Sequence, residues 1–154
     1  MKYSYQGKNG EKKVEKKIAR AFGKEVNISW KHANEICYAI RGMMLNKALV
    51  YLEKVQRKEE FVPLRRHKKQ VPHRKGKGRI TKAGRWPVKA AKEVAGVVQN
   101  ASANAEYKGL DTDKLKVEHA TAYKSVELER RKPKGSAITH NIELTNIEIV
   151  VREL

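Results

Sequence analysis

Apolar residues recur at helical spacing in two early segments of the chain. The first stripe follows the positions i, i+3, i+4 and i+7, which line one face of a helix toward a core. Its members are Ala33, Ile36, Cys37 and Ile40. Ser29 fits the N-cap of this helix, and Gly42 fits its C-terminal stop. A second stripe, formed by Ala48, Leu49, Leu52 and Val55, follows Asn46, which fits an N-cap. The pattern predicts two short helices that meet at Gly42.

A third helical pattern runs from Pro87 to Gly109. Proline is favourable in a first turn because its missing N–H would have no partner there. The apolar positions are mostly small: Ala91, Val94, Ala95, Val98, Ala101 and Ala105. Gly96 costs this helix about 1 kcal/mol relative to alanine. We expect close packing against another element to explain both the alanines and Gly96.

Beyond Gly109 the apolar period changes to two, which is typical of strands. One strand is expected from Leu115 to about Lys124, and a second from about Ile138 to Val151. Together they predict an antiparallel hairpin over about 115–152, with its tip at about 129–136. An arm of about 14 residues spans roughly 45 Å at ~3.3 Å per residue, so its distal half should protrude. The segment Val26–Ile28 is expected to add a short third strand near the base.

These elements predict an α+β fold: three helices packed on a small antiparallel sheet of about three strands, with a long protruding C-terminal β-hairpin and an extended basic loop. The chain has 154 residues, a length typical of one domain. We therefore expect a single domain over 1–154 that carries a basic insertion at about 57–86.

The charge is strongly positive and concentrated in one window. Lys and Arg number 35 against 17 Asp and Glu, which gives a net charge of +18 and favours a polyanionic partner. No acid lies between Glu60 and Glu93. The composition of Pro63–Trp86 predicts an extended loop that becomes ordered on its partner. A solvated linker is the alternative, but long blocks of like charge often act as interaction arms.

Several kinds of chemistry are not supported by the sequence. No stretch approaches the roughly 18 apolar residues of a membrane helix, and we expect a cytoplasmic protein without a membrane partner. Cys37 lies on the apolar stripe and is expected in the core. The five histidines lack metal-ligand spacing, and no nucleotide-binding glycine loop is present. We predict no enzymatic activity, cofactor, metal or small-molecule substrate.

A basic arm neutralises phosphates without reading base sequence. The two extensions suit a folded RNA, in whose unpaired regions Trp86 or His67 could stack. A DNA-binding protein that compacts duplexes would share the charge but has no use for a long hairpin.

The motifs Ser29-Trp30-Lys31, Ala39-Ile40-Arg41-Gly42 and Asn46-Lys47-Ala48-Leu49 closely resemble the universal large-subunit ribosomal protein family of the L twenty-two type, called seventeen in eukaryotes. Two further segments resemble the family: Ala101-Ser102-Ala103-Asn104-Ala105-Glu106 and Leu144–Val151. The resemblance covers about 25–57 and 86–152. The inserted segment is similar to the archaeal and eukaryotic branch.

The resemblance implies binding to large-subunit rRNA, help in subunit assembly, neighbouring large-subunit ribosomal proteins as partners, and a hairpin tip in the wall of the nascent-polypeptide exit tunnel. Candidate rRNA-binding residues are Lys31, His32, Arg41, Lys47, Arg65, Arg66, His67, Lys68, Lys69, His73, Arg74, Lys75, Lys77, Arg79, Lys82, Arg85 and Trp86. The tip that would meet the nascent polypeptide is Arg130, Arg131, Lys132, Pro133, Lys134 and Gly135. The alternative function is a general RNA- or DNA-compacting basic protein outside the ribosome.

Overall fold

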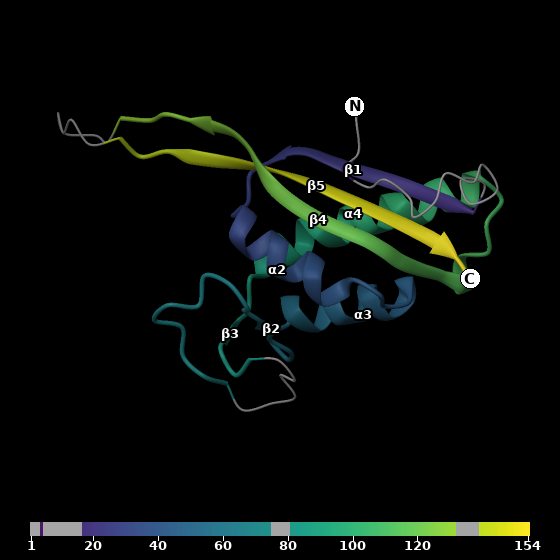
Figure 1. Cartoon of the computed structure of the whole chain (residues 1–154), viewed down its shortest axis with the longest axis horizontal. Helices are drawn as coiled ribbons and strands as arrows, with labels where there is room; N and C mark the ends of the chain where they lie inside the picture. The colour runs from purple at the N-terminus through teal and green to yellow at the C-terminus, as the bar shows by residue number, and fades with distance from the viewer. Residues whose placement is uncertain (1–3, 5–16, 75–80, 132–138) are drawn as a thin grey trace.

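Three helices lie against one face of a three-stranded antiparallel sheet, which confirms the predicted α+β fold (Figure 1). The computed structural model describes residue 4 and residues 17–74, 81–131 and 139–154. The helices are α2 (Trp30–Ile40), α3 (Leu45–Gln56) and α4 (Val88–Tyr107), with a 3₁₀ turn η1 (Thr112–Lys114). The sheet has the order β1-β5-β4, with β1 (Ile18–Val26), β4 (Leu115–Leu128) and β5 (Ile142–Glu153).

The strand β1 is longer than the sequence predicts. Instead of a short segment at Val26–Ile28, a nine-residue strand pairs with β5, with Ala19 opposite Val151 and Ala21 opposite Ile149. The core-facing residues of β1 are alanines, whose small side chains give little hydrophobic alternation. α4 packs across this strand, and a Cβ on Gly23 would lie 2.9 Å from the Cγ2 of Val97. The alanines and Gly23 therefore allow the helix to approach the sheet closely.

The hydrophobic core lies between the sheet and the predicted helical stripes. Ile36, Cys37 and Ile40 of α2 are fully buried, as are Val94 and Val98 of α4. They meet a strand face whose fully buried members are Val117, Ala120, Ile147, Ile149 and Val151. The periodicities of the sequence therefore identify most of the surfaces that form the core.

The junction between α2 and α3 is bonded to the sheet. Gly42 has a φ of 82°, a left-handed conformation that favours glycine. Its N–H donates to the carbonyl of Val117 at 2.8 Å, and the N–H of Val117 donates to the carbonyl of Met43 at 2.9 Å. This pairing fixes α2 and α3 to the edge of β4.

Two details of the helices differ from the predictions. Asn46 does not cap α3, because the N-cap is Met44, two residues earlier, which is held extended by a bridge to Lys116. Asn46 instead donates to the carboxylate of Asp113 at 3.3 Å. Close packing does not explain Gly96, since a Cβ there would meet nothing within 4 Å.

The basic loop is ordered at its base by a second, two-stranded sheet. β2 (Val62–Pro63) pairs with β3 (Gly84–Arg85), and the N–H of Leu64 donates to the carbonyl of Ala83 at 2.9 Å. Leu64 and Ala83 are buried at 3% and 6% exposure. The prediction that Pro63–Trp86 becomes ordered only on its partner is therefore wrong for the base of this segment, which the two-stranded sheet and the buried Leu64 and Ala83 already order.

The β4–β5 arm extends beyond the rest of the sheet, as Figure 1 shows. The pairing of β1 with β5 ends at Val26 and Thr145, whereas β4 and β5 continue to the pair Leu128 and Ile142. An isolated bridge between Arg131 and Thr139 lies farther out. Strand β5 begins at Ile142 rather than Ile138, and β4 is bulged between Lys124 and Glu127. The arm protrudes as predicted.

Candidate RNA-binding surface

The entry of the basic loop is attached to α2 by one buried carboxylate. Glu35 is 4% exposed, and its oxygens accept hydrogen bonds from the backbone N–H groups of Arg65 at 3.1 Å and Arg66 at 2.7 Å. The Nε of Arg65 also lies 3.9 Å from the carboxylate. Burying a carboxylate is costly unless it is paired and hydrogen-bonded. These contacts hold the loop against the helix.

Two guanidinium groups gather around Tyr38 on the solvent side of this attachment. The guanidinium of Arg65 lies over the Tyr38 ring, and the Cζ of Arg41 is 5.6 Å from the ring centroid. The same guanidinium of Arg41 is held in place, because its Nη2 donates to the carbonyl of Ala120 at 2.6 Å. The cluster joins α2, the loop and β4 into one positively charged surface.

The N-terminal turn of α2 adds a second aromatic group to this surface. The ring of Trp30 meets the ring of His67 edge to face, with centroids 5.3 Å apart, and the Nζ of Lys31 is 5.9 Å from the Trp30 ring. Burial, then the charges of Arg85 and Lys31, lower the pKa of His32 below its usual value of 6.5. His32 is therefore neutral at pH 7 and offers hydrogen bonding rather than charge.

The two sides of the loop meet through a cation–π contact. The Cζ of Arg74 lies 4.5 Å from the centroid of the Trp86 ring. The backbone N–H of Arg74 donates to the carbonyl of Lys82 at 2.7 Å. Arg74 and Lys82 are thereby held beside the two-stranded sheet at the base of the loop.

The structure brings many of the candidate residues together and separates others. Contacts from Glu35, Tyr38 and Trp30 attach the loop entry to α2. They bring Lys31, His32 and Arg41 of the α2 segment near Arg65, Arg66 and His67, and the loop also carries Lys68, Lys69, His73, Arg74, Lys82, Arg85 and Trp86. Lys47 belongs to α3, where it lines a shallow hollow with Val50 and Lys54. Lys75, Lys77 and Arg79 lie outside the described residues.

The predicted tip is only partly described. Arg130 and Arg131 are exposed at the end of the arm, where the carbonyl of Arg130 accepts a hydrogen bond from the N–H of His140 at 2.5 Å. Lys132, Pro133, Lys134 and Gly135 lie outside the described residues. The arm therefore carries at least two arginines away from the helices.

Sequence reasoning misses three residues of this surface: Glu35, Trp30 and Tyr38. Glu35 directly precedes Ile36 of the apolar stripe. An acid at the edge of a buried helix face was therefore the sequence signal that could have identified Glu35 as a contact for the loop. Trp30 and Tyr38 had no such signal, because only the position of the loop shows that their rings meet its cations.

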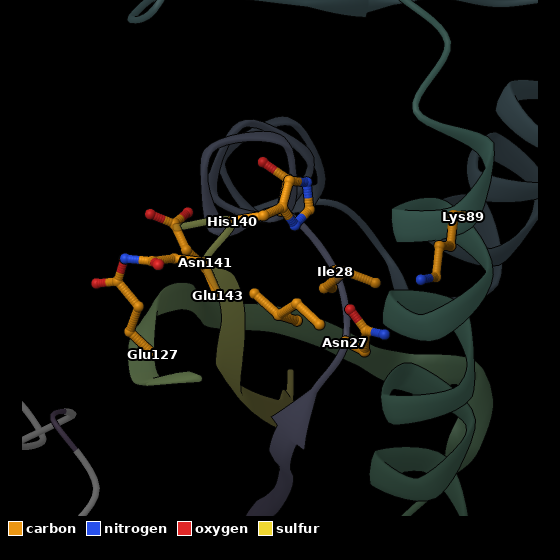
Figure 2. A pocket seen from close by; sticks show the side chains of 9 residues that line it. Asn27, Ile28, Lys89, Glu127, His140, Asn141 and Glu143 are labelled. Carbon is orange, nitrogen blue, oxygen red and sulfur yellow. The ribbon is translucent and has the colours of Figure 1, made fainter. Parts of the chain in front are cut away.

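A hollow of about 500 Å³ lies between the arm and the starts of α2 and α4 (Figure 2). Asn27 and Ile28, between β1 and α2, line this hollow together with Lys89 of α4 and with His140 and Glu143 of the arm. The Nζ of Lys124 lies 3.3 Å from Glu143 and also binds Glu127, so these acids are already partnered. The hollow combines charges of both signs and differs from the purely basic surface at the loop.

Other sites are not supported within the described part of the chain. None of its groups of histidine, cysteine and acidic side chains has the arrangement needed to hold a metal ion. None of the described helices combines the length and apolar character needed to cross a bilayer. Burial raises the pKa of the Cys37 thiol to about 12, so Cys37 is a core residue and not a nucleophile.

Comparison with known proteins gives consistent matches. A family model described as ribosomal protein L22p/L17e matches residues 21–152. The chain is 48% identical to the large ribosomal subunit protein uL22 of Methanopyrus kandleri over 90% of this chain and 89% of that protein. It is 47% identical to the protein of the same name from Archaeoglobus fulgidus, over 88% of each chain. For Methanocaldococcus jannaschii the identity is 45%, over 89% of this chain and 88% of that protein.

Proposed function

Because the chain belongs to the L22p/L17e family of ribosomal proteins, we propose that it is a structural constituent of the large ribosomal subunit that binds large-subunit rRNA. In this proposal residues 1–154 act as one domain with two extensions that face RNA and neighbouring ribosomal proteins. Membership of this family confirms the prediction that the chain is not an enzyme.

The observation that carries the rRNA proposal is the basic surface formed by α2 and the loop. Twelve bases and no acid lie between Glu60 and Glu93, and the one carboxylate that meets this segment from α2, Glu35, is buried against it. Each phosphate that such a surface neutralises releases counterions, which gives strong, salt-dependent binding. The candidate residues named above on α2 and the loop would make these contacts.

The arm supports a second part of the proposal. A two-stranded ribbon is only marginally stable in water by itself, so an external partner must support its outer half. We place its tip, residues 130–135, in the wall of the nascent-polypeptide exit tunnel, with the rRNA around the ribbon as that support. The exposed Arg130 and Arg131 fit such an RNA environment.

Sedimentation of the tagged full-length protein from cell lysate tests the first part. We expect it in the large-subunit peak after a high-salt wash, because many buried contacts hold an integrated component. Elution at moderate salt together with bulk nucleic acid would instead support a general nucleic-acid-compacting protein. Equal affinity for duplex DNA and for large-subunit rRNA fragments at physiological salt would also contradict the proposal.

Shortening the tip tests the second part. A variant in which residues 129–136 are replaced by a short turn should still enter the subunit, while the passage of certain nascent chains changes. Loss of this variant from the subunits would mean that the tip is needed for assembly and would contradict its placement in the tunnel wall.

A further inference from the structure

Two aromatic side chains of α2, Trp30 and Tyr38, lie among the cations of the loop entry without serving the core. The ring of Tyr38 is next to Arg65 and Arg41, and the ring of Trp30 is next to His67 and Lys31. Tyr38 is 37% exposed, and the side chain of Arg65 above it is 31% exposed. Cationic and aromatic side chains are thus in contact at the surface, and Tyr38 and Arg65 are partly open to solvent.

Other tyrosines of the chain show what a structural role looks like. The hydroxyl of Tyr51 donates to the carbonyl of Phe61 at 3.4 Å, and the hydroxyl of Tyr123 donates to Glu148 at 2.9 Å. Within the described part of the chain, the hydroxyl of Tyr38 makes no such bond. Its ring therefore has no evident task in holding the fold beyond the contact with the two arginines.

We propose that Trp30, Tyr38 and the guanidinium of Arg65 form a stacking site for unpaired bases of RNA. The proposal rests on the proposed function and specifies the kind of RNA that this part of the surface takes. Aromatic and guanidinium planes stack on bases that are splayed out, whereas the bases of a duplex are already stacked on each other. Trp30 and Tyr38 are eight residues apart, about 12 Å along the helix axis. That length accommodates a short run of nucleotides.

The surrounding charges complete the site. The Cζ of Arg41 is 5.6 Å from the centroid of the Tyr38 ring, and the Nζ of Lys31 is 5.9 Å from the centroid of the Trp30 ring. At these distances both cations can pair with the phosphates that join nucleotides bound at the rings. Arg41 is held by Ala120 of β4, and the backbone of Arg65 is held by Glu35. The site is therefore built before RNA arrives, which lowers the entropic cost of binding.

Replacing Tyr38 separates stacking from charge. The probes are an oligouridylate of about 12 nucleotides, within the usual span of such surfaces, and an RNA duplex of the same length. In the full-length protein, Tyr38→Leu should weaken oligouridylate binding about tenfold, because one base stack contributes ~1–3 kcal/mol. The log-log salt slope should stay unchanged, since no phosphate contact is lost, and duplex binding should stay as in the wild type.

Two further variants keep the result interpretable. Tyr107→Leu is the matched control, because Tyr107 is 94% exposed at the end of α4. This variant should bind both the oligouridylate and the duplex as the wild type does. Tyr38→Phe should bind as the wild type, since the ring and not the hydroxyl is used. Circular dichroism and urea unfolding establish that each variant is folded.

An equal loss on duplex and single strand, or no loss on either, would overturn the stacking site. Neither result touches the proposed function, which fails separately if the wild-type protein does not sediment with washed large subunits. A loss on the oligouridylate that appears together with a shallower salt slope would also contradict the proposal, because it would assign the effect to charge.

Discussion

The carboxylate of Glu35 accepts a 2.7 Å hydrogen bond from the backbone N–H of Arg66, and through it α2 holds the most basic segment of the chain. The acid is almost completely buried, so it does not offer a negative charge to an incoming polyanion. It instead offsets part of the repulsion among the bases and fixes where the loop begins. One side chain thus both orders the loop and leaves its outer surface positive.

Replacing this carboxylate should loosen the loop entry. Glu35→Gln keeps the side-chain size but turns two charge-assisted hydrogen bonds into weaker or mismatched ones, at a cost of about 1–3 kcal/mol in the free energy of unfolding. Urea denaturation measures the loss. Trypsin should also cleave after Arg65 or Arg66 faster than in the wild type.

Glu53→Gln is the control for this substitution, because Glu53 is an exposed residue of the neighbouring helix α3. It should change neither the stability nor the cleavage rate by a measurable amount. Unchanged cleavage in Glu35→Gln would show that the small two-stranded sheet holds the loop without the carboxylate.

Neutralising the loop should lower the salt dependence of rRNA binding. When Arg74, Lys75, Lys77 and Arg79 are all changed to glutamine, the log-log salt slope should flatten by about three units, at ~0.7 to 0.9 per phosphate contact. Filter binding to a large-subunit rRNA fragment over a salt series gives the slope. In a charge-matched variant with Lys24, Lys54, Lys58 and Lys114 changed to glutamine, the salt slope should flatten less than in the loop variant. Equal slopes for the wild type and the loop variant would mean that the loop touches no phosphate.

Two glycines should respond to alanine in opposite directions. At Gly42 the φ of 82° is unfavourable for alanine, and Gly42→Ala should destabilise the fold by about 1–2 kcal/mol. Gly96 lies within α4 with open space around it, so Gly96→Ala should stabilise the fold by about 0.5–1 kcal/mol. Urea unfolding of both variants tests the pair, and a destabilised Gly96→Ala would show a contact that the fold does not reveal.

Cys37 should be unreactive in the native protein. Burial raises the pKa of its thiol to about 12, so almost no thiolate exists at pH 8 and no reagent reaches the sulfur. Ellman's reagent should label the protein only after guanidinium chloride unfolds it. Rapid labelling without denaturant would place Cys37 in a region that opens readily.

His32 should make the fold less stable in mild acid. Its pKa is lowered chiefly by burial, so below pH 6.5 the unfolded chain binds more protons than the folded one, and stability falls as pH falls. His32→Gln should therefore lose less stability than the wild type between pH 7.5 and 5.5, as measured by urea midpoints. The pKa of His119 is lowered in the same direction, so some pH dependence should persist in the variant. An identical pH dependence in both proteins would contradict the prediction.

Local pattern was sufficient for the three helices and for the arm. The stripe Ala33, Ile36 and Ile40 determines which side of α2 is buried, because side chains three and four residues apart share a helix face. The alternation around Ile147 and Ile149 determines the inner face of β5 in the same way. The run of bases between Glu60 and Glu93 indicates a polyanion partner without any structure, since charge is additive along the chain.

Pairing between distant segments decided the rest. The strand β1 forms because Ala19 and Ala21 pair in register with β5 and allow α4 to lie close to the sheet. Alanines give too little hydrophobic contrast for the sequence pattern to predict this strand. The loop entry is ordered because Glu35 on α2 meets Arg65 and Arg66, 30 and 31 residues further along the chain. The same contact brings Tyr38 under Arg65. The sequence therefore determined which kinds of surface this protein has, and tertiary contacts decided which side chains lie together on the same surface. The reason is that such contacts depend on distances in space rather than on spacing along the chain.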